Sequence, residues 1–127
     1  MQKLKKLVKN SSKENFYKLR KIGEIKCNSI NKIFKVTGLF YRHVSGTTKN
    51  RALREIIERL SSISLIEKNS EKGELIESRE NIQIEKFNYK KSYKIKLKIE
   101  KIDFFIILAE KNNGNIILIS VFLNYLE

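Results

Sequence analysis

The last quarter of the chain decides the fold: residues 102–123 read IDFFIILAEKNNGNIILISVFL. Two nearly continuous apolar runs, 102–109 and 116–123, flank the polar segment KNNGN. The Asn113-Gly114 pair in that segment readily adopts the positive φ angles of a tight hairpin turn. Because continuous apolar strands are covered on both faces, the sequence predicts an antiparallel hairpin at the centre of a sheet.

Shorter strands are predicted before this hairpin. Residues 93–100 alternate apolar and charged side chains with a period of two, and residues 82–87 alternate weakly. Residues 63–81 are mixed and polar, with Gly73 as a turn. Further upstream, residues 24–37 contain short alternating pieces that predict one or two strands.

Helices are predicted in the N-terminal half. Ser11-Ser12-Lys13-Glu14 has the spacing of a capping box, which predicts a helix over 12–22 after a basic, loosely ordered segment 1–10. Residues 41–46 read as a loop, and Thr47 or Thr48 caps a second helix that runs to about residue 60. The whole chain, 1–127, is therefore expected to form one α+β domain, with N-terminal helices packed on an antiparallel sheet of about four strands.

The residue counts exclude several classes of protein. One cysteine, Cys27, excludes an intramolecular disulfide and is read as a small core residue, and one histidine, His43, excludes a His/Cys metal cluster. The glycines form neither a P-loop nor a dinucleotide-binding motif, and no apolar run reaches the ~18 to 20 residues that span a bilayer. We therefore expect no metal, no cofactor and no membrane span.

The charge is concentrated in the first part of the chain. The formal charge is +13, and residues 1–54 hold 15 basic and 2 acidic side chains, whereas residues 55–127 hold 12 of each. This asymmetry favours a polyanionic partner, foremost RNA. Two alternatives remain open, namely a Lys-rich composition inherited from an AT-rich genome and an anionic membrane surface.

The segment around the single histidine is the best candidate site. In Tyr41-Arg42-His43, an imidazole that titrates near neutrality follows an arginine. The predicted helix that follows offers phosphate ligands at its N-terminus. We take four residues at and near that N-terminus as candidate phosphate-binding residues, namely Thr47, Thr48, Lys49 and Arg51. A base, an acid and cations around a phosphate suffice for metal-free RNA cleavage by attack of the 2′-OH.

Each candidate residue also has a structural explanation. A lone histidine in a basic loop is often a surface residue, Tyr41 serves equally as a half-buried anchor, and Arg42 can bind phosphate without chemistry. Ser120 interrupts the last apolar run, so its hydroxyl either bonds to backbone or points into a cleft. The lysines of residues 93–100 either form an RNA-contacting face or protect an edge strand from aggregation.

The layout resembles the barnase–EndoU–colicin–RelE (BECR) superfamily of small ribonuclease toxin domains, over about residues 15–123. Two features carry the resemblance: a strand-like stretch, 33–37, that leads into Arg42-His43, and a last strand with a small hydroxyl residue, Ser120. It implies a metal-independent endoribonuclease, often acting on tRNA or mRNA in the cytoplasm, that is held inactive by an acidic immunity or antitoxin protein. It further implies that His43 is the acid/base, that Arg42 and Lys49 contact phosphate, and that Ser120 lies in the cleft. Many members carry a second histidine or a glutamate, so the second proton carrier is open among Tyr41, Tyr93 and a lysine.

The sequence thus predicts a ribonuclease toxin domain. The alternatives are a non-catalytic nucleic-acid-binding module and a partner-binding protein whose charge serves an acidic protein.

Overall fold

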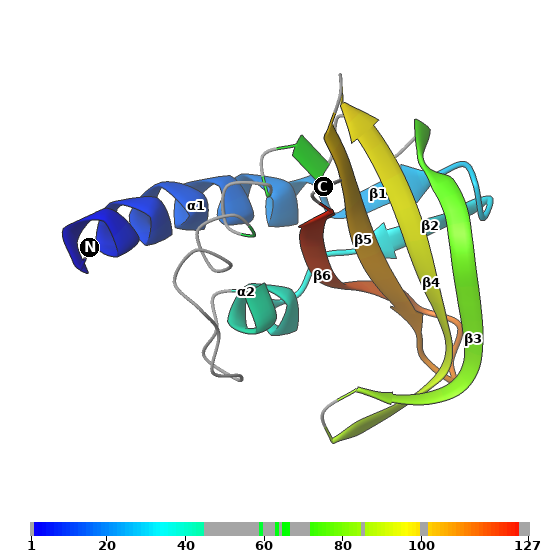
Figure 1. Ribbon diagram of the computed structural model, residues 1–127. Coiled ribbons are helices and arrows are strands. Elements are labelled where there is room, and N and C mark those ends of the chain that lie inside the picture. Colours follow the sequence, from blue (N-terminus) through cyan, green and yellow to red (C-terminus); the bar gives the residue numbers. More distant parts are fainter. Residues whose placement is uncertain are drawn as a thin grey trace.

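The computed structural model describes residues 2–44, 59, 63, 65–66, 72–84, 86–99 and 102–124 (Figure 1). The elements in chain order are α1 (Gln2–Ile22), β1 (Glu24–Cys27), β2 (Lys32–Lys35), α2 (Gly38–Val44), β3 (Glu74–Ile84), β4 (Phe87–Ile99), β5 (Ile102–Glu110) and β6 (Ile116–Asn124).

The strands form one six-stranded mixed sheet with the order β1-β2-β6-β5-β4-β3. Strand β2 runs parallel to β6, through the pair Lys35 and Ile117, and the other neighbouring strands are antiparallel. The prediction of helices packed on an antiparallel sheet of about four strands is therefore wrong. Two features that depend on long-range contacts were not predicted. The β1–β2 hairpin joins the sheet beside β6, and the polar segment that begins at Glu74 forms an edge strand.

The predicted hairpin at the centre of the sheet is confirmed. Strands β5 and β6 occupy the two middle positions, and Gly114 in their turn has a φ of 90°. Alternate residues of β5 contribute to different apolar clusters, Ile106 and Leu108 to a larger one and Ile107 and Ala109 to a smaller one. Cover on both faces thus explains why the apolar run is continuous.

Helix α1 is longer than predicted, since its backbone is helical from Gln2 and not from residue 12. The residues 2–22 contain no glycine or proline, so Ser11 and Ser12 lie within the helix instead of capping it. The C-terminal half buries Phe16 and Leu19 against the larger cluster. The helix ends at Ile22, as predicted, and is followed by Gly23 with a φ of 83°.

Helix α2 replaces most of the loop predicted over 41–46, which is wrong as far as Val44. Phe40 is fully buried, and its ring lies 6.4 Å from that of Phe16. Burial of this aromatic side chain, which a local pattern does not reveal, stabilises a helix too short to form alone. The predicted helix from Thr47 or Thr48 to residue 60 lies outside the described residues, apart from a single helical residue, Arg59.

The arm formed by β3 and β4 bends at its far end (Figure 1). Asn81 in β3 has a φ of 51°, in the left-handed region. Beyond Asn81, the side chains of Ile82, Ile84 and Tyr89 pack on the smaller cluster. This bend brings the start of β4 toward the lower half of the molecule, where α2 also lies.

Within the described part of the chain, no helix has the length and apolar character needed to cross a membrane.

Candidate nucleic-acid interface

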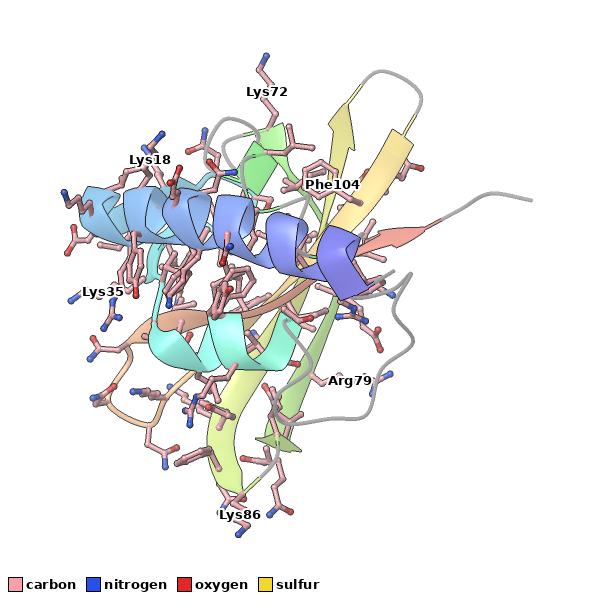
Figure 2. The ribbon with its side chains drawn as sticks, turned by 90° about the vertical axis from the view of Figure 1, so that its left-hand side faces the viewer. Lys18, Lys35, Lys72, Arg79, Lys86 and Phe104 are labelled. Atoms are coloured by element: carbon pink, nitrogen blue, oxygen red, sulfur yellow. The ribbon has the colours of Figure 1, made fainter. Side chains whose placement is uncertain are left out.

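A groove lined by polar, cationic and aromatic residues lies between α2, the start of β4 and the β5–β6 turn. We call it the α2 groove, and its volume is about 740 Å³. The lining residues are Thr37, Gly38, Leu39, Arg42, Phe87, Asn88, Tyr89, Lys111, Asn112, Asn113 and Ile117. The elements that contribute them gather in the lower half of the molecule in both views (Figures 1 and 2).

One wall of the α2 groove is helical. Leu39 packs on the smaller apolar cluster and thereby fixes the helix against β6. Arg42 follows one turn later. It is exposed and lines the same wall of the groove. Thr37, just before the helix, has a buried hydroxyl that lacks a hydrogen-bond partner among the described residues.

The opposite wall is the tight turn between β5 and β6. The N–H of Lys111 donates to the carbonyl of Asn115 at 2.8 Å, and the N–H of Gly114 donates to the carbonyl of Lys111 at 2.9 Å. The N–H of Asn115 also donates to Oδ1 of Asn113 at 3.0 Å. These bonds make the turn rigid and hold Lys111 and Asn112 exposed at the groove.

The third wall carries the aromatic side chains. Tyr89 is buried in the smaller cluster, whereas Phe87, two residues earlier, is 53% exposed. An exposed aromatic ring beside polar groups is a surface on which a planar ligand can stack. Asn88, which lies between these two residues in the sequence, also lines the groove and is exposed.

The groove is electropositive. Among the described residues that line it, two are cationic, Arg42 and Lys111, and none is acidic. Lys35 pairs in register with the lining residue Ile117, and Lys86 stands in the turn between β3 and β4. Figure 2 shows Lys86 at the lower end of the molecule and Lys35 on its outer side at about mid-height. This charge distribution favours an anionic ligand.

The structure separates the residues that the sequence predicted as one site. Arg42 lines the α2 groove, and His43 follows it in the backbone of α2, while the side chain of His43 lies outside the described residues. The ring of Tyr41 packs on that of Phe16 at 4.9 Å, as the anchor alternative predicts. Burial, with a contribution from Tyr17, raises the pKa of Tyr41, so this phenol is held neutral.

Ser120 lies elsewhere in the molecule. It is 4% exposed, and its hydroxyl accepts a hydrogen bond from Nη1 of Arg59 at 2.6 Å. The same nitrogen donates to the carbonyl of Val121 at 3.3 Å, and the guanidinium lies 5.6 Å from the ring centre of Phe122. A side chain from a distant segment thus satisfies the hydroxyl, which neither sequence alternative foresaw.

The predicted phosphate ligands Thr47, Thr48, Lys49 and Arg51 lie outside the described residues. Across the part of the chain that the structure describes, no three His, Cys, Asp or Glu side chains come together in a group able to hold a metal ion. The lysines of β4 do not guard an edge, because β3 pairs along the outer side of that strand. Lys94 lies instead 4.9 Å from the ring centre of Phe105 and 5.4 Å from that of Phe122.

Sequence reasoning missed Phe87, Asn88 and Asn112 as site residues. One local signal was present, since Phe87 is followed directly by Asn88 at the end of a weakly alternating stretch. The pairing of β4 with β5 and the bend at Asn81 bring these residues to α2, and both depend on contacts distant in sequence.

A second polar group of residues is buried at the end of β5. We call it the Glu110 cluster. Glu110 is 4% exposed, and its Oε1 accepts hydrogen bonds from Nζ of Lys32 at 3.0 Å and from the hydroxyl of Tyr93 at 2.9 Å. Nζ of Lys90 lies 3.7 Å from Oε2, and Nζ of Lys91 lies 5.3 Å from the ring centre of Tyr93. These contacts connect β2, β5 and β4.

The Glu110 cluster shifts the titration of its members. The hydrogen bond from Lys32 lowers the pKa of Glu110, outweighing the opposing effect of burial. The same bond raises the pKa of Lys32, and burial followed by the bond to Glu110 raises the pKa of Tyr93. Near neutral pH Glu110 is therefore ionised, Lys32 is protonated and Tyr93 is neutral.

In comparisons with protein-family models, curated proteins and solved structures, none matched this chain. The resemblance to BECR ribonucleases accordingly stays a prediction.

Proposed function

We propose that this protein binds single-stranded RNA in the α2 groove. The observation that carries the proposal is the composition of that groove, which combines two cations, an exposed phenylalanine and three asparagines without an acidic residue among the described lining. Cations neutralise phosphates, aromatic rings stack with bases, and amides bond to base edges. The formal charge of +13 supports the same class of partner.

The dimensions of the groove favour single strands. A volume of about 740 Å³ matches the cavities that hold small organic molecules, and thus one or two nucleotides. Phe87 offers a ring only to a base that has left its helix, because the bases of a duplex are stacked on each other. Single-stranded loops and tails of RNA are therefore the expected targets.

Fluorescence anisotropy with a labelled eight-nucleotide RNA tests this proposal. Lys111→Gln is expected to weaken binding and to lower the slope of log K against log salt by about 0.7, the value for one lost phosphate contact on a single strand. Lys72→Gln is the matched control, because Lys72 is exposed at the opposite end of the molecule from Lys86 (Figure 2). Equal losses in the two variants would show that charge alone, and not the groove, binds RNA.

Cleavage of the bound RNA is a second candidate function. His43 follows the groove-lining Arg42 and lies one helical turn after Leu39, which also lines the groove. We propose that the imidazole takes the proton of a 2′-OH, whose oxygen attacks the adjacent phosphorus as the bond from phosphorus to the 5′-oxygen breaks. Arg42 stabilises the charge that develops on the phosphate, and the leaving 5′-oxygen takes its proton from water. A neutral Tyr41, whose pKa is raised, fits a packing anchor better than a second proton carrier.

Incubation of the protein with total tRNA in EDTA tests cleavage separately from binding. The expected products end in 2′,3′-cyclic phosphate, and His43→Ala is expected to cut about 10²- to 10⁴-fold more slowly, the usual contribution of general acid–base catalysis. Intact tRNA, or equal cutting by the variant, would leave the protein as a non-catalytic RNA-binding module.

We also propose an acidic protein partner that blocks the α2 groove. The concentration of positive charge in residues 1–54, which include Arg42, supports this proposal. Such a partner is expected to compete with RNA for the groove in the anisotropy assay, and Lys111→Gln is expected to weaken both interactions. A partner that binds without displacing RNA would contradict this assignment.

A further inference from the structure

Resting on the proposed RNA binding, we infer that the bound RNA strand continues from the α2 groove into a second site on the β1–β2 hairpin. We call this site the hairpin hollow, and its volume is about 430 Å³. Its lining residues are Lys26, Asn31, Lys32, Ile33, Gly114 and Ile116. Like the α2 groove, it has two cationic residues and no acidic one among the described residues that line it.

The two sites share the β5–β6 turn. Lys111, Asn112 and Asn113 line the α2 groove, and the next residue, Gly114, lines the hairpin hollow. The backbone of this turn is hydrogen-bonded, and its residues 111–115 are all exposed. A ligand that fills one site therefore borders on the other.

The strand register places side chains of both sites on one face of the sheet. Lys35 pairs with Ile117, which lines the α2 groove, so the two side chains point to the same face. Ile33, two residues before Lys35, shares this face, and so does Lys26, the partner of Ile33 on β1. Strand β1 lies two strand spacings from β6, about 10 Å, so a single RNA strand of a few nucleotides can reach both sites.

The hairpin hollow offers two kinds of contact side by side. Lys26 is exposed, and its cross-strand neighbour Ile33 is 46% exposed. The ammonium group of Lys26 can neutralise a phosphate. The side chain of Ile33 is apolar surface that a base can remove from water without any hydrogen bond, so this contact is independent of base identity.

Lys26 is the cation to which we assign phosphate binding in the hairpin hollow. Lys32 lies on the other face of β2 and donates a hydrogen bond to Glu110 at 3.0 Å. Lys35 stands directly opposite an acidic residue, Glu24, in the β1–β2 pairing. The positive charges of Lys32 and Lys35 thus each have a nearby carboxylate.

Salt titrations of RNA binding by Lys26→Gln test the inference with oligouridines of two lengths. With a labelled eight-nucleotide RNA, the slope of log K against log salt is expected to fall by about 0.7, the value for one phosphate contact. A two-nucleotide RNA, measured by competition with the labelled one, fills only the α2 groove and is expected to bind Lys26→Gln and wild type equally. Lys111→Gln is expected to weaken binding of both lengths, and Lys72→Gln, the matched control, is expected to change neither.

The outcomes separate this inference from the function on which it rests. An unchanged slope for Lys26→Gln with the eight-nucleotide RNA, while Lys111→Gln still lowers it, would overturn the second site and leave binding in the α2 groove intact. Equal losses for the two lengths, or equal losses in Lys26→Gln and Lys72→Gln, would also overturn it, because Lys26 would then act only through the overall charge. Absence of binding to both RNAs would overturn the proposed function itself.

Discussion

The α2 groove and the Glu110 cluster both gather charged side chains on the same sheet, yet they differ in composition and exposure. In the Glu110 cluster, one buried carboxylate accepts hydrogen bonds from Lys32 and a phenol, so this acidic group is paired within the fold. In the α2 groove, Arg42 and Lys111 are exposed, and no acidic residue belongs to the described lining. The paired carboxylate supports the structure, whereas exposed cationic side chains favour an anionic partner.

The difference follows from the strands that carry each group. Lys32 faces the same side of the β1–β2 hairpin as the buried Phe34, two residues further, and this directs its ammonium group inward to Glu110. Lys111 has left β5 and stands in a turn, where nothing buries it. The same residue type therefore has a structural role in one place and, in the function proposed above, a binding role in the other.

The largest expected effect comes from removing the buried carboxylate. Glu110→Ala leaves the buried hydroxyl of Tyr93 without its acceptor and Lys32 without its partner, so we expect the free energy of unfolding to fall by about 3 kcal/mol in urea titration. Glu77→Ala is the control, because it breaks an exposed pair with Arg79 that contributes less than about 1 kcal/mol. Equal losses in the two variants would remove the distinction between buried and exposed pairs.

Removal of the exposed ring is the converse test. Phe87→Ala is expected to weaken RNA binding by about 1–3 kcal/mol, the contribution of one stacked base, and to change stability by less than about 0.5 kcal/mol. Anisotropy and urea titration on the same variant measure the two quantities. A variant that loses stability but keeps its affinity would place Phe87 in the fold and not in the binding surface.

The sequence predicted the centre of this fold better than its periphery, and β5 and β6 show why. Both strands are covered on two faces, so their apolar runs and the Asn113-Gly114 turn are visible in the local sequence. Strand β3 is exposed along most of its length, and its residues 77–81 are all polar, so no apolar alternation marks this part as a strand. Helix α2 depends on Phe40, whose burial requires partners from α1.

The candidate site was predictable only in part, for the same reason. Arg42 was found because a charged motif around a single histidine is a local signal. Asn88 and Asn112 are separated by a whole hairpin in the sequence, and their approach to α2 depends on sheet register and on the bend at Asn81. Neither the sheet register nor the bend can be predicted from composition or periodicity.

The pH dependence of stability probes the Glu110 cluster with a smaller change than truncation. Because the pKa of Glu110 is lowered from 4.5 on folding, its contribution is present above the unfolded value and is lost as the pH falls through the folded value. The raised pKa values of Lys32 and Tyr93 act on the alkaline side. Their contribution to the free energy of unfolding is lost as the pH rises above about 10. Urea titrations from pH 3 to 11 are expected to show wild type losing its advantage over Glu110→Gln at the acid end. An advantage that is unchanged at the acid end would contradict the lowered pKa of Glu110.

The smallest expected effect concerns the bend that brings the arm to the groove. Asn81 has a φ of 51°, a conformation that costs a residue with a Cβ about 1 kcal/mol unless its side chain compensates, as asparagine can. Asn81→Ala is thus expected to lower stability by about 1 kcal/mol, whereas Asn81→Gly, which adopts this φ freely, is expected to change it by less than about 0.5 kcal/mol. If the bend positions Phe87, Asn81→Ala also weakens RNA binding and Asn81→Gly does not. Equal RNA affinity in both variants, with stability reduced only in the alanine one, would show that the arm keeps its place through Ile82 and Tyr89 packing and not through the backbone at Asn81.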